Sequence, residues 1–171
     1  MKETSNKGIT SEAEMRFEKG EARRLLHELE VAGQYIFHGS PASNITELEP
    51  RQATDYSIGE EVQHGDPSIA GTPHADIAIF RAVVNHGTTG FGKTNDIIEF
   101  QATQKALDFA QDKVGYVYVL KRTDFIPLGG NERAMEWRAS QSQKPERVIL
   151  VTFDDLPDNI TIIEPLKGKT F

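Results

Sequence analysis

The spacing of hydrophobic and polar positions predicts a helix near the start of the chain. Between Ser11 and Gly33, apolar side chains recur among Glu, Lys and Arg at helical intervals, and Ser11 followed by Glu14 matches a capping box. We therefore expect an amphipathic helix that ends near Gly33, with an interruption at Gly20. Residues 1–10 are polar and lack periodicity, which predicts a flexible tail.

A strand and a long connection are expected next. The apolar run over residues 34–37 stops at turn residues that begin with Gly39, and it predicts a strand that delivers His38 to its end. Residues 41–67 hold three prolines and show little periodicity, so we expect a long irregular connection there. Residues 68–71 are small and predict a second short strand.

The second half of the chain changes from a helical pattern to a strand pattern. Thr72 can cap a helix in which Pro73 takes the first position, and apolar residues up to Val84 then share one helical face. Residues 95–113 favour a further helix. Strands are predicted at Gly115–Leu120, Met135–Ser140, Arg147–Phe153 and Asn159–Glu164. Strands that follow one another without helices predict an α+β fold with antiparallel pairing, rather than a doubly wound parallel sheet.

The composition predicts one domain and excludes several kinds of chemistry. The chain has 171 residues, no cysteine, and a net charge of −7. The lack of cysteine excludes disulfides, thiolate nucleophiles and cysteine-ligated metal sites. The negative charge disfavours a nucleic-acid partner. The length predicts a single domain over residues 11–171. Because neither an apolar leader nor a membrane-length apolar run is visible, we expect a cytoplasmic protein with no membrane partner.

Residues 87–94, GTTGFGKT, match the phosphate-binding pattern GxxxxGK[ST] at every fixed position. Such a loop cradles phosphates only where it connects a strand to a helix. If residues 73–85 form a helix, the glycines make a flexible exit loop, which is the interpretation we favour. If residues 77–84 form a strand instead, nucleotide binding by a P-loop is the alternative.

Histidine spacing gives no sign of a metal centre, because the five histidines lack the close pairs that present two imidazoles to one ion. We expect no metal. His38 differs from the others because it ends an apolar strand and precedes Gly39, and a glycine allows a ligand to approach the backbone closely. Its alternative role is that of a hydrogen-bonded structural residue at the end of a strand.

Glu136 is the second residue singled out by the pattern. In a strand over residues 135–140, Glu136, Arg138 and Ser140 would lie on one face, opposite Met135, Trp137 and Ala139. Taken alone, this alternation also fits an exposed polar face behind a buried tryptophan.

Four segments together carry a resemblance to a known family. They are HGSPASNITELEPRQA from His38, DIAIFRAVV from Asp76, GYVYVLKRTDF from Gly115, and EWRAS from Glu136. These segments resemble a group of bacterial HGSP-containing proteins of unknown function. More broadly, His38-Gly39-Ser40 at the end of a strand, then a small-residue strand that enters a helix, then Glu136-Trp137 on a late strand, resembles the ADP-ribosyltransferase superfamily over about residues 35–155. In the diphtheria-toxin-like branch, which includes the poly-ADP-ribose polymerases, the signature is His-Gly on the first strand, Tyr on the next and Glu on a later one.

The resemblance implies a split antiparallel sheet with an N-terminal helix and one or two further helices, and NAD as the substrate. It implies that His38 binds a ribose hydroxyl, that the Gly39 backbone holds the nicotinamide amide with Ser40 beside it, and that Glu136 is the catalytic carboxylate. A carboxylate stabilises the positive charge that builds on the ribose as the bond to nicotinamide breaks.

One position departs from the family signature. Ser68 stands where the nicotinamide-stacking tyrosine is expected, and a hydroxymethyl group has no aromatic face. Either another aromatic residue such as Tyr56 replaces it, or NAD binding is altered or lost. The leading hypothesis is ADP-ribosyl transfer to an unidentified acceptor, such as a protein, or NAD hydrolysis. The alternatives are a catalytically silent module of the same fold that binds an ADP-ribose-like ligand or a protein, and the P-loop.

Overall fold

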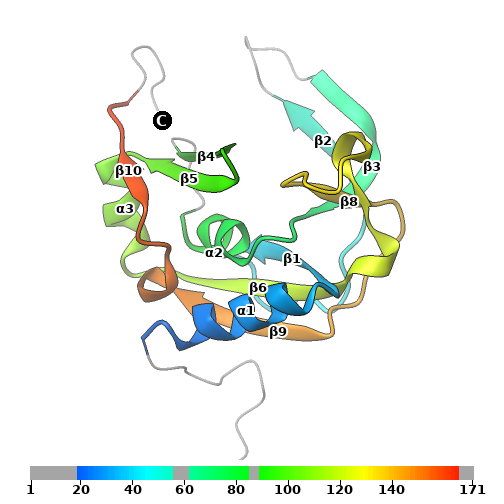
Figure 1. Cartoon of the computed structure of the whole chain (residues 1–171), viewed down its shortest axis with the longest axis horizontal. Coiled ribbons are helices and arrows are strands. Elements are labelled where there is room, and N and C mark those ends of the chain that lie inside the picture. The colour runs from blue at the N-terminus through cyan, green and yellow to red at the C-terminus, as the bar shows by residue number, and fades with distance from the viewer. Residues whose placement is uncertain (1–18, 56–61, 85–88, 166–171) are drawn as a thin grey trace, which may run out of the picture.

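The chain folds into an α+β arrangement of helices and small sheets (Figure 1). The computed structural model describes residues 19–55, 62–84 and 89–165. Within these residues the helices are α1 (Glu21–Ala32), α2 (Ala75–Val83) and α3 (Gln104–Ala110). The strands are β1 (Tyr35–Ser40), β2 (Arg51–Asp55), β3 (Val62–Gly71), β4 (Thr89–Thr94), β5 (Ile97–Ala102), β6 (Val114–Lys121), β7 (Ile126–Pro127), β8 (Trp137–Ala139), β9 (Arg147–Thr152) and β10 (Ile160–Ile162).

An antiparallel sheet of order β1-β6-β9 forms the centre of the structure. Because side chains alternate along a strand, each strand contributes to both faces of this sheet. Phe37, Val117 and Val119 pack with α1 and α2 in one apolar core. Ile36, Tyr118 and Leu120 point to the opposite face and pack in a second core with Trp137 of β8 and Ile69 of β3. The central sheet is therefore covered on both sides.

Two glycines let α2 lie directly against the central sheet. A Cβ atom placed on Gly39 of β1 would be 1.9 Å from the carbonyl oxygen of Ala78, and one placed on Gly115 of β6 would be 2.4 Å from that of Ala82. Ala78 and Ala82 are one helical turn apart, so they lie on the same face of α2. Small residues on both elements thus allow the helix backbone to approach the strands closely.

Two smaller sheets lie on either side of α2 (Figure 1), with orders β2-β3-β8-β7 and β10-β5-β4. The first is antiparallel, and in the second β10 runs parallel to β5. The first sheet meets β1 at one bridge, where Phe37 and Thr72 exchange backbone hydrogen bonds of 2.8 and 2.9 Å. Beyond this bridge β1 and β3 are no longer paired, which leaves a split between the sheets.

The α+β class and most of the strands predicted from the sequence are confirmed. α1 ends as predicted at Gly33, whose left-handed φ of 71° favours glycine. α1 begins at Glu21, directly after Gly20, where an interruption was predicted; the predicted capping box at Ser11 and Glu14 and the tail lie outside the described residues. Among these residues, no helix is long and apolar enough to cross a membrane.

Two predictions about elements are wrong, and a third is confirmed only for the helix α3. Residues 41–67 are not irregular throughout, since they include β2 and the beginning of β3. Residues 95–113 contain β5 as well as α3. α2 begins at Ala75 instead of after Thr72, because a carboxylate of α1, that of Glu30, accepts the Ala75 N–H at 2.9 Å and replaces the expected threonine cap.

Candidate active site

A pocket of about 480 Å³ lies at the split between the central sheet and the β2-β3-β8-β7 sheet. It brings together residues that are far apart in the sequence. His38 and Ser40 reach it from β1, Ser68 from β3, and Glu136 from the residue before β8. The histidine and the glutamate singled out in the sequence therefore line one cavity.

His38 is fixed in this pocket by a hydrogen bond to the neighbouring sheet. Its Nδ1 atom lies 2.7 Å from the carbonyl oxygen of Ala70 on β3. Because a carbonyl only accepts, Nδ1 carries the proton and donates it, which leaves Nε2 as an unprotonated acceptor. Burial lowers the pKa of His38, as do the charges of Arg81 and Arg51, although the bond to Ala70 opposes the shift. The imidazole is thus neutral at pH 7.

Glu136 is held at the pocket by its neighbours in sequence. Arg138 donates from Nε to the Glu136 carboxylate at 2.9 Å, and both side chains are about one-third exposed, at 31% and 29%. The expected alternation is confirmed, since Arg138 shares the pocket with Glu136 while Trp137 and Ala139 are buried on the other face. The Trp137 indole donates to the carbonyl of Ala134 at 3.2 Å, which anchors the segment.

Gly39 contributes backbone groups at the open edge of β1. The N–H and C=O of Phe37 bond to Thr72, so they point away from β6. Directions alternate along an antiparallel strand, and those of Gly39 therefore also point away from β6. In the described part of the chain no backbone hydrogen bond across this edge continues past Phe37. A donor and an acceptor thus lie side by side, as a primary carboxamide requires.

The reason for glycine at position 39 differs from the one expected. We predicted that its missing side chain gives a ligand room to approach. The structure shows that this side of Gly39 faces α2, where a Cβ atom would collide with the carbonyl oxygen of Ala78. Gly39 therefore lines a neighbouring hollow rather than the pocket of His38 and Glu136.

The aromatic residue of the family signature is not found among the described residues of the pocket wall. Ser68 does line the pocket, on β3. Tyr56, the proposed substitute, lies outside the described residues. Among the residues that the structure describes, no phenylalanine, tyrosine or tryptophan lines this pocket. The described wall therefore offers no aromatic ring of these kinds on which a nicotinamide could stack.

Several residues of the site were missed in the sequence. Tyr118 of β6 donates its hydroxyl to Ala42 at 2.6 Å and accepts the N–H of Ile45 at 3.3 Å, so it ties one wall of the pocket to the central sheet. Its apolar neighbours mark it only as a core residue. Arg51 lines the pocket from β2, within the segment expected to be irregular.

The phosphate-loop match has a different local structure from both interpretations. Residues Thr89–Thr94 form β4, which pairs in a hairpin with β5, while Gly87 and Thr88 lie outside the described residues. Lys93 lies 3.5 Å from a carboxylate oxygen of Asp96. The expected flexible exit loop is wrong for these residues. The P-loop also lacks its context, because β5 follows where a helix is required.

The candidate site thus combines a neutral histidine, a paired carboxylate and an open strand edge. Within residues 19–55, 62–84 and 89–165, no group of three or more His, Asp or Glu side chains is arranged to hold a metal ion.

Comparisons of the chain with models of protein families, with curated proteins and with solved structures find no match.

Proposed function

We propose that this chain binds NAD and transfers its ADP-ribose to a nucleophile, which is either an acceptor group or water. The observation that carries the proposal is the meeting of His38 and Glu136 in one pocket of about 480 Å³, next to the backbone groups of Gly39, with which no backbone group of the described residues pairs across that edge. These residues occur in the order of the family signature. The meeting of His38 and Glu136 in one pocket supports the roles that the resemblance implies.

Each group has a chemical task in this reaction. The Gly39 N–H donates to the carboxamide oxygen of nicotinamide, and its C=O accepts from the carboxamide nitrogen. The Nε2 atom of His38 accepts a hydrogen bond from a ribose hydroxyl. Both contacts need a fixed partner, and β1 supplies it because its backbone is held by β6 on one side and by Thr72 on the other.

Glu136 acts on the bond that breaks. As the carbon–nitrogen bond between ribose and nicotinamide lengthens, its electron pair leaves with the nicotinamide and positive charge builds on the sugar. A carboxylate near the ribose stabilises that charge more strongly in the transition state than in the bound substrate. The bond from Arg138 keeps the carboxylate in one orientation.

The test is turnover of labelled NAD by the unmutated chain and by Glu136→Gln. We expect the substitution to lower the rate by roughly 10²- to 10³-fold, as the loss of one transition-state contact typically does. Glu132→Gln is the matched control, because Glu132 is exposed and pairs with Arg122 outside the pocket. An unmutated chain that neither binds nor turns over NAD would rule out the proposal.

A silent binding module is the second candidate, and the described pocket wall favours it on one point. Ser68 occupies the position of the stacking aromatic residue, and the described residues supply no Phe, Tyr or Trp in its place. Calorimetry with NAD and ADP-ribose separates the two candidates. Binding without turnover supports the module, whereas binding of neither leaves only a protein partner for it.

A further inference from the structure

A second hollow of about 370 Å³ lies on the other side of the end of β1. Alternate residues of this strand line the two cavities, with His38 and Ser40 in the first and Gly39 and Pro41 in the second. The remaining wall of the second hollow comes from α2, the residue that follows it and β4, through Phe80, Arg81, Val84, Thr89, Gly90 and Phe91. The hollows are therefore neighbours separated by one strand.

Arg81 is the charged group of this second hollow. It lies in the last turn of α2, is exposed, and its guanidinium carbon is 5.0 Å from the centre of the Phe91 ring. Stacking on a ring engages the face of a guanidinium and leaves its N–H groups, which lie in the plane, available to a ligand. A flat cation thus lies over a ring, and in the described part of the chain no carboxylate pairs with its N–H groups.

Arg81 has no carboxylate partner in the described part of the chain, although the chain carries a net charge of −7. Other arginines in the described part do pair with carboxylates, namely Arg23, Arg24, Arg122 and Arg138. The charge of Arg81 also reaches the first cavity, since it contributes to lowering the pKa of His38. A guanidinium beside the candidate site, without a carboxylate partner among the described residues, is suited to contact an anionic ligand.

We propose that this hollow is a phosphate-binding subsite, in which Arg81 contacts the pyrophosphate of a ligand whose nicotinamide end lies at the Gly39 edge. The identity of the ligand rests on the proposed function. The fork of a guanidinium matches two phosphate oxygens at once, which a lysine cannot reproduce. The two hollows then bind two parts of one molecule across the end of β1.

Calorimetry with ADP-ribose and with inorganic pyrophosphate tests the subsite. We expect Arg81→Gln to weaken both affinities by about tenfold to a hundredfold, the loss typical of a charged hydrogen bond, and Arg81→Lys to restore them only in part. Free nicotinamide should bind all variants equally. Arg24→Gln is the matched control, because Arg24 is an exposed arginine of α1 that lines neither hollow.

The outcomes separate this inference from the proposed reaction. If NAD is not turned over but ADP-ribose affinity depends on Arg81, the subsite stands and the transfer reaction fails. If Arg81→Gln and Arg24→Gln bind ADP-ribose equally well, the subsite is refuted, whether or not NAD is consumed. Failure of the unmutated chain to bind ADP-ribose and pyrophosphate refutes it as well. Because Arg81 also lies at the C-terminal end of α2, thermal unfolding of each variant shows whether lost affinity merely follows lost stability.

Discussion

The two faces of the β1-β6-β9 sheet are built from the same strands, but one face packs an apolar core and the other opens into the candidate site. On one face Phe37, Val117 and Val119 are fully buried beneath α1 and α2 in an apolar core. On the other face the core around Tyr118 gives way, towards the end of β1, to the pocket of His38. A shift of one residue along β1 therefore separates the packed interior from the candidate active site.

We call the face of Phe37, Val117 and Val119 the closed face and the face of His38 the open face. Contacts on the closed face hold β1 in place for the open face. α2 presses on β1 through Gly39, and the Phe37–Thr72 bridge fixes the strand laterally. The backbone that carries His38 is thus held before any ligand arrives, which is the condition for effective positioning. Polar side chains can gather on the open face because rigidity is supplied from behind. The following four substitutions test this division.

Gly39→Ala should have the largest effect, because it inserts a methyl group between the sheet and α2. The new carbon would lie 1.9 Å from a backbone oxygen of Ala78, so α2 must move away from the closed face. We expect a loss of about 3 kcal/mol or more in the free energy of unfolding, at the upper end of typical overpacking costs. Urea denaturation measures it. Gly92→Ala is the control, since its Cβ atom meets nothing within 4 Å; equal losses in both variants would contradict the close contact.

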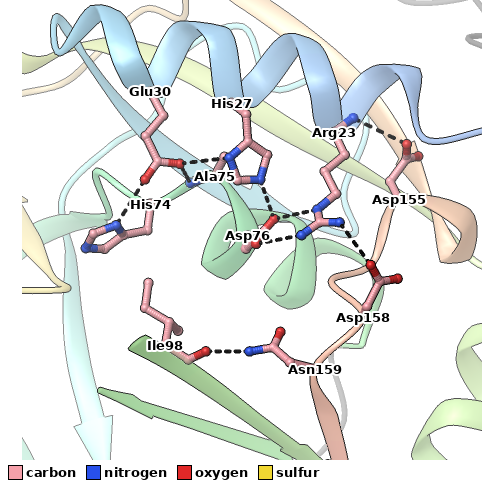
Figure 2. A network of polar contacts seen from close by, with 10 residues as sticks. All are labelled: Arg23, His27, Glu30, His74, Ala75, Asp76, Ile98, Asp155, Asp158 and Asn159. Carbon is pink, nitrogen blue, oxygen red and sulfur yellow. Dashed lines mark hydrogen bonds and ion pairs between the residues drawn. The ribbon is translucent and has the colours of Figure 1, made fainter. Parts of the chain in front are cut away.

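Asp76→Asn should have the next largest effect, because Asp76 joins α1 to α2 above the closed face (Figure 2). Its carboxylate accepts from Arg23 at 2.9 and 3.0 Å and contacts His27 at 2.8 Å, with 19% of the side chain exposed. Leaving these partners unpaired should cost about 2 kcal/mol, less than for a fully buried pair. Asp158→Asn is the control, because the fully exposed Asp158 contacts the same arginine at 3.8 Å. A change in chemical denaturation no larger than that of the control would contradict the prediction.

Tyr118→Phe should have a smaller effect that is confined to the open face. The substitution removes the hydroxyl that bonds Ala42 and Ile45, and the free energy of unfolding should fall by about 1 kcal/mol. Ligand affinity should fall as well, since both residues line the pocket. Tyr116→Phe is the matched control, because no hydrogen bond of its hydroxyl is found in the described residues. Indistinguishable stability and affinity in the two variants would show that the pocket wall does not depend on Tyr118.

The smallest effect is a dependence of stability on pH that differs between the faces. Burial lowers the pKa of His38 in the folded protein below its value of about 6.5 in the unfolded chain. As the pH falls below about 6.5, the unfolded chain therefore binds the proton first. The free energy of unfolding then decreases until the pH reaches the pKa of the folded state. Burial acts to raise the pKa of Asp76, but the hydrogen bonds and charges of Arg23 and His27 together outweigh it, so that pKa is also lowered. Its contribution is complete above about pH 4 and is lost below that.

Chemical denaturation at roughly equal pH steps between about pH 3 and pH 8 measures the free energy of unfolding across both ranges, an upper one near pH 6 for His38 and a lower one below about pH 4 for Asp76. His38→Gln should flatten the dependence in the upper window and Asp76→Asn in the lower one. If His38→Gln leaves the slope near pH 6 unchanged, the imidazole of His38 is not held neutral by the fold.

The sequence predicts those parts of the fold whose signals are local. The strand over residues 115–120 follows from its β-branched and aromatic residues, and the end of α1 follows from Gly33. The β4–β5 hairpin was missed although a signal exists. Asn95 and Asp96 both have positive φ, at 50° and 64°, as in the tight turns that join hairpin strands. The glycine-rich strand before this turn has little strand propensity of its own and is stabilised by its pairing with β5.

The candidate site could be predicted only in part. His38 and Glu136 are named by the order of motifs, and the structure places both in one pocket. Arg138 could be expected there because alternation puts it on the face of Glu136. Arg81 and Arg51 could not be predicted as residues of the site, because only the fold brings their charges close to His38 and no local pattern in the sequence indicates this. β2 could not be predicted within residues 41–67, because its conformation depends on pairing with β3 and the prolines around it favour an irregular connection.

The contact of Gly39 with α2 has a consequence for the comparison of future homologues. Helix packing demands glycine at this position whether or not the proposed dinucleotide is bound, so a homologue without the proposed activity would keep it as well. His38 and Glu136 carry no such packing demand from α2. Whether a homologue has both His38 and Glu136, rather than whether it has the glycine, would therefore indicate whether it shares the proposed activity.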